Sequence, residues 1–259
     1  METYEKWVKK KVLITVRTYP VPSRKSIEVS CTAGITEDGE WIRLFPVPYR
    51  FLTQDKRFVK YQYIEAEVTK SHSDFRRESY KLNVDSVNIL GQKLSTENKW
   101  LKRKDIIFPL MSDSLCSLKS ERDTNKYPTL GFFKPRVITG LKIESTIDQW
   151  NDDELTSLRQ YPMFDNIPQH QLEKLPYKFS YQFKCNEKNC TGHEIECTDW
   201  EVGASFLSWR RKYGRQWEQK FRDKYETEMA LGKDIHFFVG TINNHPGEWL
   251  IVGLFYPPK

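Results

Sequence analysis

The 259 residues of this chain are 38% hydrophobic and 14% aromatic, which excludes an intrinsically disordered protein and suits one large domain or two small ones. The net charge of +6 is unevenly distributed: residues 1–104 carry 21 Lys and Arg and 13 Asp and Glu, a net +8, whereas residues 105–259 sum to −2. A basic N-terminal part favours a polyanionic partner, although a solvated charged face explains the same excess.

The first predicted element is a β-branched strand over residues 11–19. The apolar run is too short to cross a bilayer, and the Arg17 and Tyr-Pro that follow it do not form a signal-peptide cleavage site. We therefore expect a cytoplasmic protein with no membrane partner. Thiols stay reduced in that compartment, so clustered cysteines there favour a metal site over a disulfide.

Short strands follow in the N-terminal part, at residues 26–35, 41–47, 61–70, 80–90 and 105–110. Asp38-Gly39 separates two of them and is a strong hairpin signal. Several short strands with turn signals between them are typical of a small barrel. With a returning strand at 134–145, they predict a basic, β-rich, barrel-like domain over residues 1–145.

Two polar stretches interrupt this pattern. Residues 111–131 are polar and broken, and we expect a long surface loop that proteases cut first. Residues 146–175 are locally acidic and contain prolines, with a short helix expected at 151–160. We interpret this second stretch as the segment that connects two domains.

A second domain is predicted over residues 176–259, with the order ββααββ. Tyr177–Lys184 alternates aromatic and polar residues, as a strand does. Thr198 and Glu201 have the spacing of a capping box for a helix that ends near Tyr213. A second helix at 216–231 and an apolar hairpin over 234–256 complete the domain. The fold class expected for the whole chain is therefore α+β.

The stretch CNEKNCTGHEIEC, from Cys185 to Cys197, contains three of the five cysteines and one of the five histidines. Thiolates and imidazole hold Zn²⁺ tetrahedrally, and short loops with turn residues bring such ligands together. We expect one structural Zn²⁺, with four ligands listed here: Cys185, Cys190, His193 and Cys197. A redox cysteine pair and unliganded core thiols are the alternatives.

The position of Cys197 poses a geometric problem for its role as a ligand. If a straight strand runs on from His193, Cys197 lies about 13 Å further along it, too far to share one ion. His236 and His245 on the final hairpin are the alternative fourth ligands. Glu201 and Asp199 are explained by helix capping, so nearby carboxylates do not indicate a catalytic zinc.

Basic residues in the N-terminal half alternate with aromatic residues. Trp41 and Arg43 belong to one strand with the same alternation and should share a face. Single-strand-binding barrels use such mixtures, with cations along phosphates and aromatics stacked on bases. The candidate nucleic-acid-binding residues are Arg17, Tyr19, Arg24, Lys25, Trp41, Arg43, Arg50, Arg210 and Arg211.

The sequence thus predicts a zinc-containing protein that binds RNA or DNA. Two other functions stay open: an enzyme acting on nucleic acid or nucleotides, with its site between the two halves, and a protein-interaction adaptor. An enzyme requires titratable groups that converge in a pocket, whereas a binding protein requires only an exposed positive face. The sequence does not predict an oligomeric state.

Overall fold

The chain divides into two compact units that each combine distant stretches of sequence. The computed structural model describes residues 6–160 and 167–259. The first unit contains residues 1–94 and 149–174, and the second contains residues 95–148 and 175–259. These boundaries differ from the expected ones, because residues 95–145 pack with the C-terminal unit and most of the acidic stretch packs with the N-terminal one.

The N-terminal unit is a closed five-stranded barrel. Its strands are listed in chain order: β1 (Val8–Arg17), β3 (Ile27–Thr36), β4 (Trp41–Val47), β5 (Tyr63–Lys70) and β6 (Ser79–Leu82). The order around the barrel is β1-β3-β4-β6-β5, and β5 returns to pair with β1. Only the β4–β6 pair within this ring is parallel. This is the connectivity of the OB-fold.

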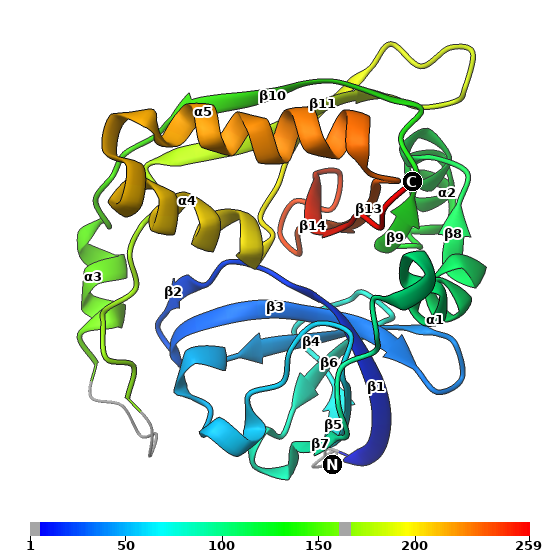
Figure 1. Cartoon of the computed structure of the whole chain (residues 1–259). Helices are drawn as coiled ribbons and strands as arrows, with labels where there is room; N and C mark the ends of the chain where they lie inside the picture. Colours follow the sequence, from blue (N-terminus) through cyan, green and yellow to red (C-terminus); the bar gives the residue numbers. More distant parts are fainter. Residues whose placement is uncertain (1–5, 161–166) are drawn as a thin grey trace. The chain divides into compact units, whose positions relative to one another are not determined.

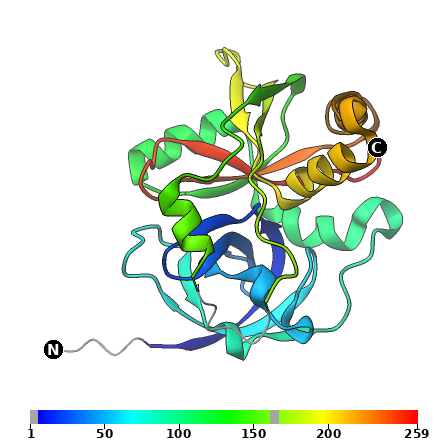
Figure 2. The same cartoon turned by 90° about the vertical axis from the view of Figure 1, so that its left-hand side faces the viewer.

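Alternation along the strands fills the barrel. Ile42 and Leu44 on β4 and Ile64 and Val68 on β5 belong to one buried cluster, as a period of two predicts for one face of each strand. The short strands β2 (Val21–Ser23) and β7 (Asn88–Leu90) extend the sheet. Helix α3 (Asp152–Leu158) lies beside β2 in both views (Figures 1 and 2).

The C-terminal unit contains two antiparallel-rich sheets and their helices. One sheet has the order β10-β11-β12 and the other β14-β13-β9-β8. The strand bounds are β8 (Met111–Ser112), β9 (Leu130–Phe133), β10 (Val137–Ser145), β11 (Tyr177–Lys184), β12 (His193–Glu196), β13 (His236–Thr241) and β14 (Trp249–Phe255). The helices are α1 (Glu97–Ile107), α2 (Leu115–Asn125), α4 (Trp200–Tyr213) and α5 (Trp217–Arg222), the last continued by a π-helical segment, Asp223–Gly232.

Three sequence expectations change in this unit. The strand expected at residues 105–110 is instead the end of α1 and a 3₁₀ turn, Phe108–Leu110. The predicted loop at 111–131 contains helix α2, because Ser114 caps its first turn by accepting from the Ser117 amide at 2.9 Å. The α4 cap is Asp199 rather than Thr198: one Asp199 oxygen accepts from the Glu201 amide and the other from the Leu254 amide. Among the described residues, no helix is both long and apolar enough to cross a membrane.

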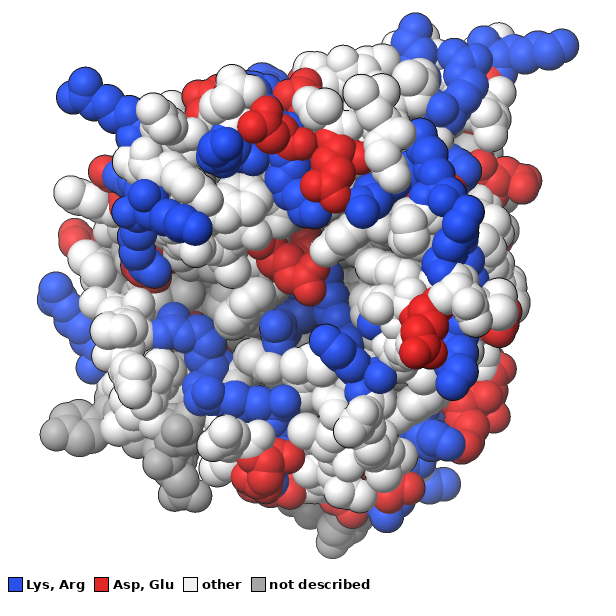
Figure 3. All heavy atoms as spheres, in the orientation of Figure 1, with Lys and Arg blue, Asp and Glu red and all other residues white. Residues whose placement is uncertain are grey.

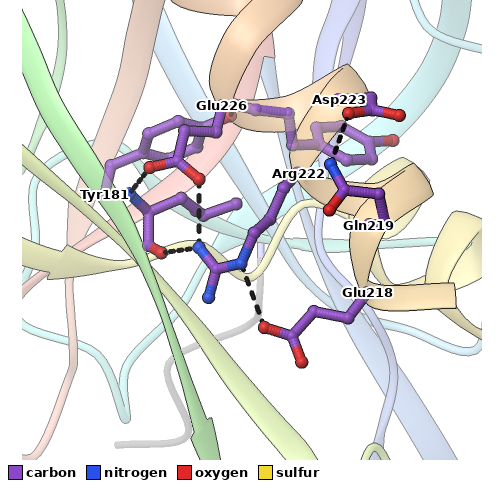
Figure 4. A network of polar contacts seen from close by, with 8 residues as sticks. Tyr181, Glu218, Gln219, Arg222, Asp223 and Glu226 are labelled. Carbon is purple, nitrogen blue, oxygen red and sulfur yellow. Dashed lines mark hydrogen bonds and ion pairs between the residues drawn. The ribbon is translucent and has the colours of Figure 1, made fainter. Parts of the chain in front are cut away.

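A polar network fixes the long helical segment to the edge strand β10. Arg222 Nη1 donates to the Leu141 carbonyl oxygen at 2.7 Å and lies 3.0 Å from Glu226 Oε2, while Glu226 Oε1 accepts the Leu141 amide at 3.1 Å (Figure 4). Glu218 accepts from Arg222 Nε at 3.0 Å. The helix thereby satisfies backbone groups that an edge strand otherwise leaves unpaired.

We predict that Glu226→Ala lowers the free energy of unfolding by about 1–2 kcal/mol, since it leaves the Leu141 amide and Arg222 without their shared acceptor. Glu218→Ala is the matched control. It removes a half-exposed carboxylate that accepts from the Arg222 side chain, and should cost less than about 1 kcal/mol. Urea unfolding followed by circular dichroism measures both, and equal losses would contradict the role assigned to Glu226.

Candidate metal centre

A folded-back loop between β11 and β12 brings three metal-binding side chains together. The Glu187 carbonyl oxygen accepts from the Cys190 amide at 3.1 Å, which closes a turn. Gly192 has a φ of +107°, a conformation that favours glycine. The Cys185 amide then donates to Cys190 Sγ at 3.2 Å. His193 is the first residue of β12, so its ring lies next to this turn.

The fourth side chain is Cys116, which the sequence analysis did not select. It belongs to the first turn of α2, 69 positions before Cys185. The Ser114 hydroxyl donates to the Glu187 carboxylate and so ties the start of α2 to the β11–β12 loop. The partial positive charge of the helix N-terminus favours a thiolate at Cys116, but burial acts in the opposite direction and raises the pKa of this thiol.

The geometry fits a tetrahedral ion. One ligand atom from each of Cys116, Cys185, Cys190 and His193 lies within 4.8 Å of all the others. His193 Nε2 is 3.2 Å from Cys116 Sγ and 3.5 Å from Cys190 Sγ. A tetrahedron with metal–sulfur bonds of about 2.3 Å and metal–nitrogen bonds of about 2.05 Å has sulfur–nitrogen edges of about 3.5 Å. These four residues can therefore hold a metal ion.

Cys197 is not part of this cluster. Its backbone amide donates to the Phe179 carbonyl oxygen at 2.7 Å, and it forms a β-bridge with Ile251. Its side chain is buried in the core of the C-terminal unit. The strand that follows His193 stays extended, and this separates Cys197 from the other three side chains.

The two alternative histidines also lie outside the cluster. His236 is buried, with Nδ1 2.9 Å from the Asp234 carbonyl oxygen and its ring stacked on Phe132. His245 is exposed in the turn between β13 and β14, 3.9 Å from Glu248. The structure thus groups three of the four expected ligands with Cys116.

The protonation of the four groups reflects their shared burial. Burial, reinforced by the neighbouring Cys185 thiol, raises the pKa of Cys116 to about 12. Burial also raises the pKa of Cys185. At Cys190 burial acts in the same direction, but hydrogen bonds from the Cys185 and Gly192 amides outweigh it and lower the pKa. Burial lowers the pKa of His193, which favours the neutral imidazole that binds metals.

Most of the candidate nucleic-acid-binding residues of the N-terminal unit make contacts within that unit. The Arg17 guanidinium lies over the Tyr49 ring at 3.8 Å, Tyr19 donates to the Glu173 carbonyl oxygen, and Arg24 pairs with Asp153 at 2.9 Å. Lys25 is exposed and Trp41 partly exposed. Arg50 pairs with Glu28 at 3.2 Å. Arg210 and Arg211, in the C-terminal unit, are exposed in the last turn of α4.

Arg43 is not a surface residue. Its side chain is 2% exposed, lies 3.7 Å from the Glu78 carboxylate and donates to the Ser79 hydroxyl. Arg43 alternates with the buried residues Ile42 and Leu44 of β4, as expected for a side chain on the outer face of that strand. The connection from β5 to β6, which contains Glu78, nevertheless covers this side chain. A guanidinium this buried does not meet a phosphate in this conformation.

We predict that Cys116→Ser removes bound metal, whereas Cys197→Ser leaves about one metal ion per chain, since only Cys116 belongs to the four-residue cluster. Elemental analysis of both variants, purified without added metal and compared with the parent, gives the stoichiometry. Loss of metal from Cys197→Ser with retention in Cys116→Ser would overturn the assignment of the fourth ligand.

Two family models match the chain in succession. A model described as a domain of unknown function (DUF8758) matches residues 8–109, which include every strand of the barrel. A model described as a domain of unknown function (DUF8757) matches residues 111–259, which include all four side chains of the candidate metal centre. A comparison with curated proteins found no match. Because the second model matches more than half of the length of this chain, the chain belongs to the DUF8757 family.

Proposed function

We propose that this chain is a zinc-containing nucleic-acid-binding protein, with a structural Zn²⁺ in the C-terminal unit and a nucleic-acid-binding barrel in the N-terminal unit. The zinc assignment is supported by the donor set of three cysteines and one histidine, a combination of soft and borderline ligands that Zn²⁺ prefers. Four protein ligands leave no open position for water, which favours a structural over a catalytic ion.

Nucleic-acid binding is supported by two exposed aromatic rings on a barrel of OB-type connectivity. Phe45 on β4 is 41% exposed, and Phe75 in the connection from β5 to β6 is 59% exposed. Barrels of this connectivity bind oligonucleotides on the face of their second and third strands and on the loop between the fourth and fifth. In this chain those two places are β3–β4 and the β5–β6 connection, where Phe45 and Phe75 lie.

Other features limit where a strand of nucleic acid binds. Nearly every residue of β3 is buried, so the proposed contact is restricted to Phe45 and the β5–β6 connection. Charge adds little support, because Asp and Glu side chains lie among the Lys and Arg side chains on the face drawn in Figure 3. The proposal therefore depends on base stacking, which each exposed ring offers to any base.

The zinc proposal predicts that removal of the metal by a chelator lowers the melting temperature by on the order of 10 °C, because a structural metal contributes its binding free energy to folding. Binding requires deprotonated thiols and a neutral imidazole. The stabilisation is therefore present at neutral pH and is lost as the pH falls. Calorimetry of the parent with and without chelator tests this, and Cys116→Ser, which lacks a ligand, should not respond to the chelator.

The nucleic-acid proposal predicts that Phe75→Ala weakens binding of single-stranded RNA or DNA by about 1–3 kcal/mol, the value of one base–aromatic stack. Ile147→Ala, which truncates a 75% exposed apolar side chain in the other unit, is the control and should bind as the parent does. Fluorescence anisotropy with labelled oligonucleotides gives the affinities. If neither the parent nor the variants bind, the enzyme and adaptor hypotheses gain support.

A further inference from the structure

The N-terminal unit contains a cavity of about 340 Å³. One wall comes from the start of β3 and the 3₁₀ turn Tyr49–Phe51, and the other from the end of α3 and residues 167–172. Figures 1 and 2 show α3 beside the β2–β3 hairpin. The volume lies within the range of small-molecule sites.

Direct contacts hold the two walls together. Tyr19 donates to the Glu173 carbonyl oxygen at 2.8 Å, and Arg24 pairs with Asp153 at 2.9 Å. The Arg50 guanidinium donates to the His170 carbonyl oxygen. The cavity is therefore built by contacts between residues more than 100 positions apart.

A buried acidic residue, Glu28, is part of the cavity lining. Glu28 is 2% exposed, and its Oε2 lies 3.2 Å from Arg50 Nη1. Its Oε1 is buried and has no hydrogen-bond partner among the described residues. Burial raises the pKa of Glu28, while Arg50 acts in the opposite direction. An unsatisfied buried acceptor is costly, typically about 1–3 kcal/mol, unless a donor reaches it.

The backbone next to Glu28 is strained. Ile27, a β-branched residue, has a φ of +61°, a region that L-residues with branched side chains rarely adopt. The Glu28 amide donates to the Ser26 carbonyl oxygen, two residues earlier. Such conformations persist where the surroundings over-determine them, and they cluster at binding sites. Here the strained residue immediately precedes the carboxylate that lines the cavity.

The lining defines the chemistry of a ligand. Glu28 Oε1 requires a hydrogen-bond donor, Arg159 at the exposed end of α3 favours an anionic group, and Phe51 and Leu172 offer apolar surface to a planar ring. A nucleotide combines these three properties. Guanine presents a ring N–H and an amino group side by side, which together match a carboxylate. Adenine and cytosine place their amino group beside a ring acceptor, and uracil places its N–H between two carbonyls.

We propose that this cavity binds a guanine nucleotide unit, with the phosphate near Arg159 and the base edge on Glu28, whose buried carboxylate turns into the cavity on binding. The inference goes beyond the barrel surface proposed above, because neither Phe45 nor Phe75 lines the cavity. The unit is either a free nucleotide or one guanosine within a strand, since the two share this chemistry.

Isothermal titration of the full chain with GMP and IMP tests the base contact, because IMP lacks only the amino group. The parent should prefer GMP by about tenfold or more, as expected for loss of half of a bidentate contact. Glu28→Gln should abolish the preference, because an amide has only one acceptor oxygen. Glu40→Gln, which changes an exposed carboxylate outside the cavity, should retain it. Equal binding of GMP and IMP by the parent, or a preference that survives in Glu28→Gln, overturns the proposal.

Two further arms keep the test decisive if Glu28→Gln does not fold. Arg159→Ala changes an exposed residue, and in this variant GMP should lose its advantage over guanosine; an unchanged advantage contradicts the phosphate assignment. Short oligouridine with and without one guanosine separates the two sources of the ligand. If both oligonucleotides bind equally, this binding is lost in Phe75→Ala, and GMP does not bind, then the barrel proposal stands and the cavity proposal is overturned. If GMP binds and this binding depends on Glu28, but neither oligonucleotide binds, the cavity proposal is supported and the barrel proposal is contradicted.

Discussion

The convergence of four ligand side chains on a small volume is the constraint on which the C-terminal unit depends. Three thiols and an imidazole lie within 4.8 Å of one another, and burial opposes ionisation of Cys116 and Cys185. Without a cation, each additional thiolate repels the others, so Cys116 and Cys185 favour the protonated form, although hydrogen bonds lower the pKa of Cys190. A divalent cation reverses this preference. The α2 cap, the Glu187 link and the Gly192 turn all lie around this cluster.

Local sequence patterns predict the three ligands that belong to a single loop, the one between β11 and β12. Cys185, Cys190 and His193 fall within nine residues, with turn formers between them, and the loop places them together. Cys116 lies in a polar stretch with weak apolar periodicity, so the sequence does not indicate the helix that carries it. Only tertiary contacts bring Cys116 to the other three side chains. The rise per residue of a strand places Cys197 too far from His193 to share one ion. The chain after His193 is extended in β12, which agrees with that distance argument.

The same distinction explains the barrel. The alternation of apolar residues and the Asp38-Gly39 turn predicted its strands, because a period of two is a local property. The fate of Arg43 was not predictable in this way. Alternation places it on the outer side of β4, yet its partners there are Glu78 in the β5–β6 connection and Ser79, the first residue of β6. Likewise, nothing in the composition of residues 149–174 indicates that they pack against the barrel. One wall of the Glu28 cavity therefore lies in the region matched by one family model and the other wall in the region matched by the second.

The distance along the chain between Cys116 and the other ligands has a consequence for the order of folding. Three ligands are close in sequence and can meet in an otherwise unfolded chain, but Cys116 lies 69 positions before Cys185 and joins them only after the segment between them has closed. Closing such a loop is entropically unfavourable until β9, β10 and β11 have formed their pairings. A metal ion held by all four side chains would therefore be fully coordinated only after these strands have paired. In a compact zinc finger, by contrast, the ligands are close in sequence and the metal is needed for folding.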